Sequence, residues 1–410
     1  MEGTHVVTCF LRHGTDVLLC RRSDAVGSYV GQWGAVAGHA EGNPDTQAWR
    51  EIAEETGLED DCERLRAGEP FPVVDEDRKT RWVVHPYLFD CASEDVTTNE
   101  ETSAWEWVPP TEILRRDTVP ELWASYDAVR PTVETVEADG EHGAAYLSVR
   151  ALECLRDSAA LAMERGVETD LAALAERLRG ARPGMAVVAN RVARTLRSGA
   201  DPEMVERAAS AEIQAALDAD EAAATNAAER IDGERVVTCS RSGTVLRALE
   251  TADPESVLLT ESRPGSEGVA AAESLADTHD VTLVSDAAAS GALESWGADR
   301  VLVGADTVFE SAISNKVGTY PLALAAREMG IPFDAVCADD KIAPADWTFQ
   351  AEAAPEIYGG DADLSVANPL FERVPLALVD SVVTEDGELD GEAVAKRARA
   401  RRVEDAGRDG

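Results

Sequence analysis

The sequence predicts an α/β protein that contains two kinds of sheet. Near the N-terminus, four apolar runs surround one helical segment at 44–56, which is typical of a mixed sheet with a helix packed on it. In the C-terminal part, short apolar runs alternate with helical segments, which is typical of a parallel sheet covered by helices on both faces. The predicted strands of the mixed sheet are 5–10, 16–20, 81–89 and 105–108.

The same pattern predicts three parts of the chain. We expect a first domain over residues 1–124, a helical part over 125–205 and a second α/β domain over 206–410. The helical part is predicted from alanine-rich segments with helical periodicity. The strands expected in the second α/β domain are 235–239, 256–261, 281–285, 299–304 and 333–337.

The composition is strongly acidic. The chain has 78 Asp and Glu against 38 Lys and Arg, which gives a net charge of -40. Its lysines are Lys79, Lys316, Lys341 and Lys396. Because the acids are spread along the whole chain, we favour a halophilic protein whose hydrated surface needs molar salt over an acidic protein with disordered tails.

Composition also excludes several function classes. So acidic a surface lacks the phosphate-neutralising stripe that free nucleic acid requires. The seven cysteines have no paired metal spacing, and we expect reduced thiols rather than a disulfide framework. We see neither a signal peptide nor an apolar run that could span a bilayer, and therefore expect a soluble cytoplasmic protein without a membrane partner.

The helix expected at 44–56 carries signals at both ends and acids between them. Asn43 can cap it and Gly57 suits the position after its last turn. Glu51, Glu54 and Glu55 fall at i, i+3 and i+4 and therefore share one face. Such crowding destabilises a bare helix unless a hard divalent cation lies among the carboxylates. The alternative is a solvated acidic face.

The run Arg50-Glu51-Ile52-x-Glu54-Glu55-x-Gly57-Leu58 resembles the second half of the Nudix box. The resemblance implies a Nudix fold, an α/β/α sandwich with a mixed sheet. It also implies that the three glutamates supply metal ligands and basic function, with Mg²⁺ or Mn²⁺ as cofactor. Arg50 would orient one of the acids, and the substrate would contain a diphosphate linkage.

The first half of this box departs from the pattern. The stretch from Gly38 to Arg50 is two positions short, and Gly42 stands where a glutamate is expected, with Glu41 beside it. Four further residues lie where such folds often bind the phosphates or base of the substrate, although core or rim positions are the alternative. They are Arg21, Arg22, Tyr29 and Trp33. We expect His39 and His85 to be structural.

A second candidate site follows the strand expected at 235–239. A helix begins at Ser240, Arg241, Ser242, Gly243 and Thr244, so that backbone N–H groups and hydroxyls can bind an anion there. The alternative is an ordinary helix cap.

The segments after this helix start resemble one known family. They are ESRPGSEG (261–268), SDAAASG (285–291), VGADTVFESAISNKVGTY (303–320) and GIPFDAVC (330–337), preceded by HGAA (142–145) and ARPGM (181–185). The family holds the alpha, beta and delta subunits of translation initiation factor 2B, methylthioribose-1-phosphate isomerase and ribose-1,5-bisphosphate isomerase. The resemblance implies a helical subdomain followed by a Rossmann-like parallel sheet.

The resemblance also implies which residues bind a phosphorylated ligand. These are Arg182, Arg263, Asp306, Asn315 and Lys316. Three positions depart from the isomerases: Ser240 replaces their reactive cysteine, Glu267 replaces a glutamine and His142 replaces an arginine. Cys239 lies one place early and should point to the other face of its strand. A serine has no accessible thiolate, so isomerase activity is not expected.

Our leading hypothesis is an enzyme. Its Nudix domain would hydrolyse a nucleoside diphosphate derivative, and its second domain would bind a phosphorylated sugar or nucleotide in a regulatory role. One alternative is a factor-2B-like binding protein, acting in translation initiation, with a degenerate Nudix domain. Another is a sugar-phosphate isomerase. By analogy with the family, we expect a homo-oligomer.

Overall fold

A computed structural model describes residues 3–76, 78–197, 199–349, 357–358, 360 and 362–406, with side chains through Arg401 in the last helix. The chain divides into two compact units. The first unit comprises Met1–Thr132 and Arg156–Thr169, and the second comprises Val133–Leu155 and Asp170–Gly410. Each unit has its own sheets.

The sheet of the first unit is mixed. The order of its central strands is β3-β2-β1-β7-β5, with β4 beside β1, β6 beside β7 and β8 beside β2. β1 and β7 run parallel, whereas the other neighbours are antiparallel. The strands are β1 (Thr4–His13), β2 (Asp16–Arg22), β3 (Trp33–Gly34), β4 (Val36–His39), β5 (Cys62–Ala67), β6 (Phe71–Asp75), β7 (Thr80–Cys91) and β8 (Thr102–Val108). The four strands predicted here are confirmed and extended.

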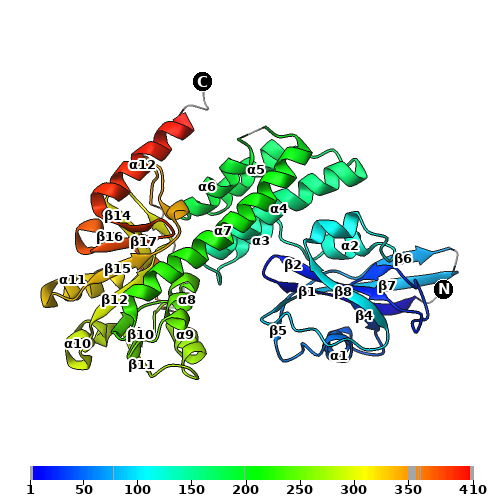
Figure 1. The fold of residues 1–410 in the computed structure, drawn as a ribbon, viewed down its shortest axis with the longest axis horizontal. Coiled ribbons are helices and arrows are strands. Elements are labelled where there is room, and N and C mark those ends of the chain that lie inside the picture. The colour runs from blue at the N-terminus through cyan, green and yellow to red at the C-terminus, as the bar shows by residue number, and fades with distance from the viewer. Residues whose placement is uncertain are drawn as a thin grey trace. The chain divides into compact units, whose positions relative to one another are not determined.

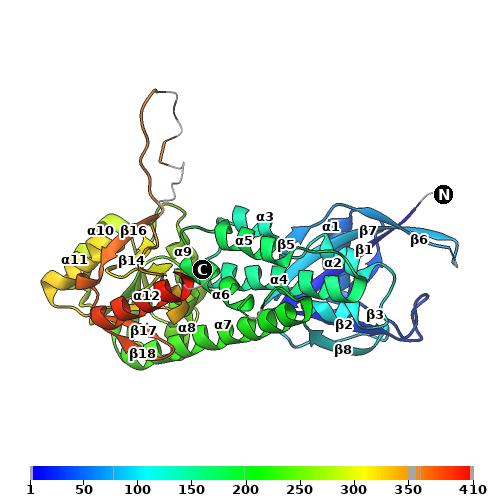
Figure 2. The same cartoon turned by 90° about the horizontal axis from the view of Figure 1, so that it is seen from above.

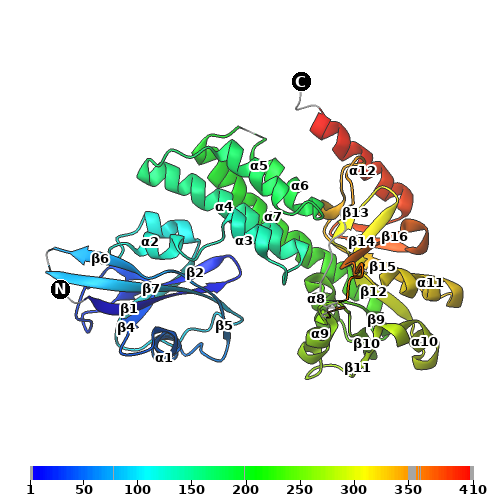
Figure 3. The same cartoon turned by 180° about the vertical axis from the view of Figure 1, so that it is seen from behind.

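Helices cover both faces of this sheet. Along β1, Cys9 and Leu11 point to one core, whereas Phe10 points to the other. The first core contains Ile52 of α1 (Pro44–Thr56), and the second contains Tyr126 of α2 (Leu122–Asp127). Figures 1 and 3 show α1 and α2 on opposite sides of the sheet. The expected α/β/α sandwich is therefore confirmed, with η1 (Pro110–Leu114) preceding α2.

One expectation about the cysteines is wrong. Cys62 of β5 and Cys91 of β7 face each other in the antiparallel register and form a disulfide. Their positions lie 29 residues apart, and only strand pairing brings them together. The other five cysteines are buried and form no disulfide.

The second unit begins with helices. They are α3 (Val133–Ala138), α4 (Ala144–Arg165, whose last part belongs to the first unit), α5 (Leu171–Ala181), α6 (Ala186–Thr195) and α7 (Pro202–Ile231). Asp201 caps α7, and the helix packs against α8 and β17 (Figure 2). A helical subdomain is therefore present as expected, and α7 runs across the boundary expected between residues 205 and 206.

The larger sheet of the second unit has the order β11-β10-β9-β12-β15-β17-β18. Its strands are parallel except for β18, which pairs antiparallel at the edge. The strands are β9 (Arg235–Thr238), β10 (Ser256–Thr260), β11 (Val281–Val284), β12 (Arg300–Gly304), β15 (Phe333–Val336), β17 (Ser381–Thr384) and β18 (Gly387–Leu389). All five predicted strands are present.

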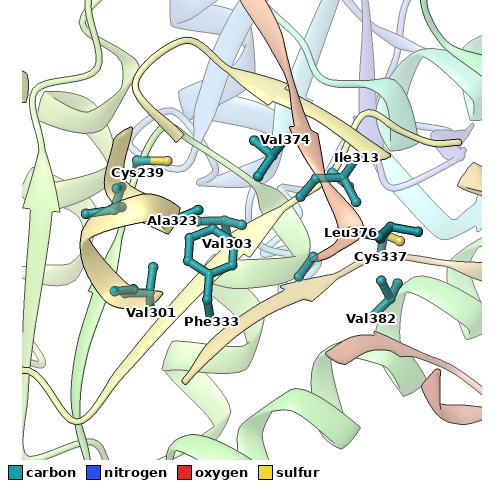
Figure 4. Packing of buried hydrophobic residues seen from close by; sticks show 14 of the residues in the cluster. Cys239, Val301, Val303, Ile313, Ala323, Phe333, Cys337, Val374, Leu376 and Val382 are labelled. Atoms are coloured by element: carbon teal, nitrogen blue, oxygen red, sulfur yellow. The ribbon is translucent and has the colours of Figure 1, made fainter. Parts of the chain in front are cut away.

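Alternate residues of these strands enter two cores. Val236 and Leu302 pack with α7, α8 (Gly243–Thr251) and α9 (Glu267–Leu275) on one face. Val237 and Val303 pack on the other face with α10 (Asp286–Trp296), α11 (Thr319–Met329) and α12 (Gly391–Ala406). Figure 4 shows part of this second core around Phe333. The sheet is therefore covered on both faces, as Rossmann-like sheets are.

A small antiparallel sheet was not predicted. It has the order β13-β14-β16 and consists of β13 (Thr307–Val308), β14 (Ala312–Lys316) and β16 (Phe371–Pro375). Two 3-10 helices, η2 (Asp339–Lys341) and η3 (Leu376–Leu378), lie nearby in sequence. None of the helices in the described part of the chain combines the length and apolar character needed to cross a bilayer.

Candidate functional site

The helix α1 is fixed at both ends and on its buried side. The Asn43 side chain accepts a hydrogen bond from the backbone of the first turn, and Pro44 begins the helix. Gly57 ends it with φ = 68°, in the left-handed region that favours glycine. Ile52 is fully buried against the sheet. Anchored in this way, the helix presents Glu51 and Glu54 to a pocket.

This pocket lies within the first unit and has a volume of about 680 Å³. That volume is typical of small-molecule sites. Its lining is partly polar and partly apolar. The charged lining residues are Arg22, Glu41, Arg50, Glu51, Glu54 and Glu101, and the apolar or aromatic ones include Val6, Tyr29, Val73, Trp82 and Val84.

Glu51 is held from two sides. The Nε2 amide of Gln47 donates a hydrogen bond of 2.6 Å to Oε1 of Glu51. A Cβ atom at Gly38 would lie 1.8 Å from the same oxygen, so this position of β4 has to be glycine for the carboxylate to fit. Burial raises the pKa of Glu51, and the charge of Glu54 adds to the shift. The carboxylate therefore lies in a preformed place at the pocket wall.

Glu55 is the most buried of the three helix glutamates, with 7% of its surface exposed. The backbone N–H of Ala37 donates to its Oε1 at 3.2 Å. Burial, with a contribution from the charge of Glu51, raises the pKa of Glu55 to about 8. Among the described residues no basic side chain forms an ion pair with it. Only the more distant charge of Arg22 opposes the rise in the pKa of Glu55, together with the hydrogen bond from Ala37.

Glu54 and Arg50 form an exposed ion pair one turn apart on α1. The Arg50 Nε lies 2.6 Å from Oε1 of Glu54. Exposed pairs of this kind contribute little to stability. Arg50 is therefore placed to orient the carboxylate, as the Nudix resemblance implies.

The donor chemistry of this site fits a hard divalent cation, because Mg²⁺ and Mn²⁺ prefer carboxylate oxygens. Gly38 also leaves room for the Glu51 carboxylate at the pocket wall. Among the described residues, however, no three His, Cys, Asp or Glu side chains converge closely enough to be recognised as a metal centre. Gln47 and Arg50 hold Glu51 and Glu54 instead. A bound cation would draw the carboxylates together.

The pocket also has an aromatic wall, which the sequence revealed only in part. Tyr29 was a candidate, whereas Trp82 was not. The Trp82 Nε1 donates to the Tyr29 hydroxyl at 3.3 Å, and that hydroxyl donates to Asp75 at 2.7 Å. The guanidinium of Arg78 lies 4.5 Å from the centre of the Tyr29 ring. These contacts fix two flat rings beside the polar part of the pocket.

Two further lining residues were missed because they lie in the connection before β8. Asn99 donates to the backbone oxygen of Glu54 at 3.2 Å, and its own side-chain oxygen accepts from the backbone of Glu101 at 2.9 Å. Glu101 thereby joins the carboxylates of the pocket. No local motif marks it, since the connection reaches α1 only through tertiary structure.

The remaining candidates of the first domain separate into two groups. Arg22 lines the pocket, and so does His39, which we expected to be structural. Arg21 instead donates to the backbone oxygen of Gly31, and Trp33 lies under the guanidinium of Arg116. Neither Arg21 nor Trp33 is among the pocket residues. Both have structural contacts.

In the second unit, the topology itself indicates a binding crevice. The strand order reverses between β9 and β12, because the chain proceeds from β9 to β10 on one side and from β12 to β15 on the other. Ligands of parallel α/β sheets bind at the carboxyl ends of strands at such a switch point. The segments that follow these two strand ends are 239–242, which leads into α8, and 305–306.

The candidates Ser242, Gly243 and Asp306 lie at this switch point. Ser242 caps α8, with Oγ 3.4 Å from the backbone N–H of Val245. A Cβ at Gly304 would lie 2.5 Å from that same Oγ, which shows how closely the two segments approach. Asp306 is half-buried, and its backbone N–H donates to Ser314. The cap interpretation of Ser242 is confirmed, and the helix N-terminus remains a candidate anion site.

Cys239 points into the interior of the second unit. Its Sγ lies 3.3 Å from the Thr319 hydroxyl and 3.8 Å from Nδ2 of Asn315, which itself is buried. Burial raises the pKa of the Cys239 thiol to about 11. Ser240 has φ = 65° and donates its backbone N–H to Ser262 Oγ at 2.7 Å. Neither residue offers a reactive thiolate near neutral pH.

Lys316 is buried and paired. Its Nζ lies 2.6 Å from Oε1 of Glu267 and also donates to the backbone oxygen of Pro264. In the same loop, the backbone N–H groups of Ser262 and Arg263 both donate to the carboxylate of Asp286. Several of the donors that could bind an anion therefore already have partners within the chain.

The three arginines predicted to bind a phosphorylated ligand lie in different places, and so does His142. Arg182 donates to the backbone oxygen of Asp139 at 2.6 Å, in the helical part. Arg241 is exposed, and Arg263 is mostly exposed beside Glu261 at 3.4 Å. His142 bonds to Asp139 rather than taking over an arginine's role. The described contacts thus bring Asn315 and Lys316 close to the end of β9, whereas Arg182 is held by the helical part.

Comparison with known proteins identifies both parts of the chain. Residues 140–391 match the Initiation factor 2 subunit family, and residues 3–129 match the NUDIX domain. The crystal structure of the Pyrococcus horikoshii translation initiation factor eIF-2B is similar, with a TM-score of 0.54 and 25% identity. That match covers 63% of this chain and 95% of the other.

Two sequence relatives are isomerases by name. A probable bifunctional methylthioribose-1-phosphate isomerase/methylthioribulose-1-phosphate dehydratase of Nocardia farcinica is 34% identical over 54% of this chain and 46% of its own length. A ribose 1,5-bisphosphate isomerase of Haloterrigena turkmenica is 32% identical over 41% of this chain and 58% of its own length. The chain thus spans about half the length of the curated relatives it matches.

Proposed function

Because the chain belongs to the Initiation factor 2 subunit family and also carries a NUDIX domain, we propose that its first unit hydrolyses a diphosphate linkage in a nucleoside diphosphate derivative with the help of a divalent metal. The observation that carries this proposal is a helix with three glutamates, one of them buried without an ion-pair partner among the described residues, beside a pocket of about 680 Å³. Glu51, Glu54 and Glu55 would hold Mg²⁺ or Mn²⁺. When bound, such an ion polarises a phosphoryl oxygen and lowers the pKa of a coordinated water.

The residues around the carboxylates have separate tasks in this proposal. Gln47 orients Glu51 and Arg50 orients Glu54 through the hydrogen bonds described above. Arg22 adds a positive charge to the lining that can attract the phosphates. Trp82 and Tyr29 provide flat surfaces against which the organic part of the substrate can stack. The substrate class is therefore a diphosphate that carries a planar group.

The test is a screen of nucleoside diphosphate derivatives for Mg²⁺-dependent hydrolysis, in molar potassium chloride because of the acidic composition. We expect the Glu54→Gln/Glu55→Gln variant to lose at least about 100-fold in kcat, because two of the three helix carboxylates lose their charge. Glu59→Gln is the matched control, since Glu59 is exposed beyond the end of α1 and does not line the pocket. A double variant that keeps the wild-type rate would disprove the site.

We propose that the second unit binds a phosphorylated sugar or nucleotide and has a regulatory role. The observation in favour is the switch point between β9 and β12, beside which Asn315 contacts Cys239. An isomerase reaction requires groups that shuttle protons near neutral pH. The buried Cys239 thiol, with its pKa near 11, and Ser240 do not provide them. Binding without sugar isomerisation therefore fits these residues best.

A further inference from the structure

We propose that Glu267 competes with anionic ligands for Lys316, so that a phosphorylated ligand has to displace this carboxylate in order to bind the second unit. The inference rests on the ligand-binding role proposed for that unit. Lys316 lies on β14 and is 2% exposed. Its ammonium has two acceptors among the described residues, the Glu267 carboxylate at 2.6 Å and the backbone oxygen of Pro264.

The ion pair is linked to the strand end at the switch point. Asn315, the neighbour of Lys316, contacts the Cys239 Sγ at 3.8 Å, where β9 ends. The loop that contains Pro264 is joined to the same strand end, because Ser262 Oγ accepts from the backbone N–H of Ser240 at 2.7 Å. The ammonium of Lys316 is thus bonded to the loop that adjoins the end of β9, the strand end at which the topology predicts a ligand.

The burial of Lys316 determines what a ligand must supply. A buried ammonium that loses its carboxylate is strongly unfavourable unless another negative charge replaces it. Phosphate oxygens can accept the same hydrogen bond and carry the same sign of charge. The nearby backbone N–H groups of Ser262 and Arg263 cannot substitute, because the Asp286 carboxylate already accepts from both. Lys316 is therefore the donor for which an anion would compete.

Glu267 is the member of the pair that can move. Its side chain is 34% exposed, whereas that of Lys316 is 2% exposed. Its second carboxylate oxygen, Oε2, is buried and has no hydrogen-bond partner among the described residues. A buried acceptor without a donor is unfavourable, and rotation of the side chain toward solvent would hydrate it. An anionic ligand can thus replace Glu267 without moving the lysine.

Calorimetric titration with ribose 5-phosphate, and separately with inorganic phosphate, tests this competition. We expect Glu267→Gln to bind ribose 5-phosphate at least tenfold more tightly than wild type, because the amide no longer neutralises the ammonium. Glu273→Gln, an exposed change on the same helix α9, is the matched control and should bind as wild type does. Glu267→Asp, whose shorter side chain reaches Lys316 less well, should also tighten binding.

Thermal unfolding checks that each variant is folded before titration. The proposal is overturned if neither Glu267→Gln nor Glu267→Asp binds more tightly than wild type, or if the gain persists in Glu267→Gln/Lys316→Met. If wild type and variants bind measurably and equally, the proposed competition is wrong, but the binding role of the second unit still holds. If no protein binds either ligand, both the competition and the proposed binding role are wrong.

Discussion

The two units treat buried carboxylates in opposite ways. In the first unit, burial raises the pKa of Glu55 to about 8, and no basic side chain among the described residues pairs with it. In the second unit, burial would also raise the pKa of Asp340, but Arg194 and Arg191 hold it well below the ordinary value. The arginines lie within 3.1 Å of the carboxylate oxygens.

This difference distinguishes a carboxylate that the fold itself neutralises from one whose charge a bound cation would neutralise. Asp340 is neutralised within the fold and therefore needs nothing from outside. Glu55 is buried on the same helix as the pocket-lining Glu51, and burial disfavours its charged form, which a bound cation would stabilise. Lys316 is an intermediate case, because its partner Glu267 is intramolecular yet partly exposed. A counter-charge that can be exchanged is what distinguishes this pair from the Asp340 network.

The largest effect expected from this comparison is a pH-dependent stability difference at Glu55. Without metal, the folded protein keeps a proton on Glu55 between its ordinary pKa and about 8, whereas the unfolded chain has released it. The free energy of unfolding therefore falls as pH rises through this window, and the contribution is constant above it. Across about three pH units the loss is on the order of 4 kcal/mol.

Glu55→Gln removes the titrating carboxyl group, so the stability of this variant is the reference for wild type. Denaturant unfolding in chelator, followed by tryptophan fluorescence between about pH 5 and 8, should show wild type losing stability relative to the variant as pH rises. Six of the eight tryptophans lie in the first unit, so the signal reports mainly on it. Parallel stability curves for the two proteins would contradict the buried, uncompensated state of Glu55.

Local signals explain which elements the sequence could predict. The bounds of α1 agree with the prediction because Asn43, Pro44 and Gly57 act within one turn of the helix ends. The small sheet was missed because its pairing joins distant segments, such as Lys316 with Phe371. The strands are short, and their partners cannot be read from periodicity.

The candidate sites show the same limit. The motif identified Glu51, Glu54 and Glu55, but not the pocket residues that reach them from other segments. Trp82 and Glu101 come from β7 and from the connection before β8. Likewise, the sequence marked Glu267 and Lys316 as separate positions, 49 residues apart, and only the fold joins them in one ion pair. Spacing along the chain does not encode such contacts.

An intermediate effect is expected at Glu101, the carboxylate that the motif does not contain. It lines the same pocket as Glu51, and its charge contributes to the raised pKa of Glu51 and of Glu55, in which burial is the main cause. If it helps to hold the cation, Glu101→Gln should weaken Mn²⁺ binding about tenfold, or about 1.4 kcal/mol. Titration of the protein with Mn²⁺ alone, followed by electron paramagnetic resonance, measures this directly.

The neighbouring residue provides the control for Glu101. Glu100 is exposed and does not line the pocket, so Glu100→Gln should bind Mn²⁺ as wild type does. Equal weakening in both variants would indicate a general effect of surface charge rather than a ligand, since each removes one negative charge. No weakening in Glu101→Gln, with loss of binding in Glu51→Gln, would confine the metal site to α1.

The smallest effect is expected at Trp82, where the pocket is apolar rather than charged. The ring is half-buried, and its Nε1 is held by the Tyr29 hydroxyl at 3.3 Å, so one flat surface is fixed in the lining. Stacking of a planar group on such a ring contributes about 1 kcal/mol. Trp82→Ala should therefore raise KM about fivefold for diphosphates that carry a nucleobase, with kcat nearly unchanged.

Substrates without a planar group sharpen this last prediction. Hydrolysis of 5-phosphoribosyl 1-pyrophosphate, if the enzyme accepts it, should have the same KM in wild type and Trp82→Ala. Trp105→Ala is the matched control, because Trp105 is 39% exposed on β8 and does not line the pocket. An equal rise in KM for both substrate types would mean that Trp82 shapes the pocket instead of contacting a ring. The carboxylates alone would then account for recognition.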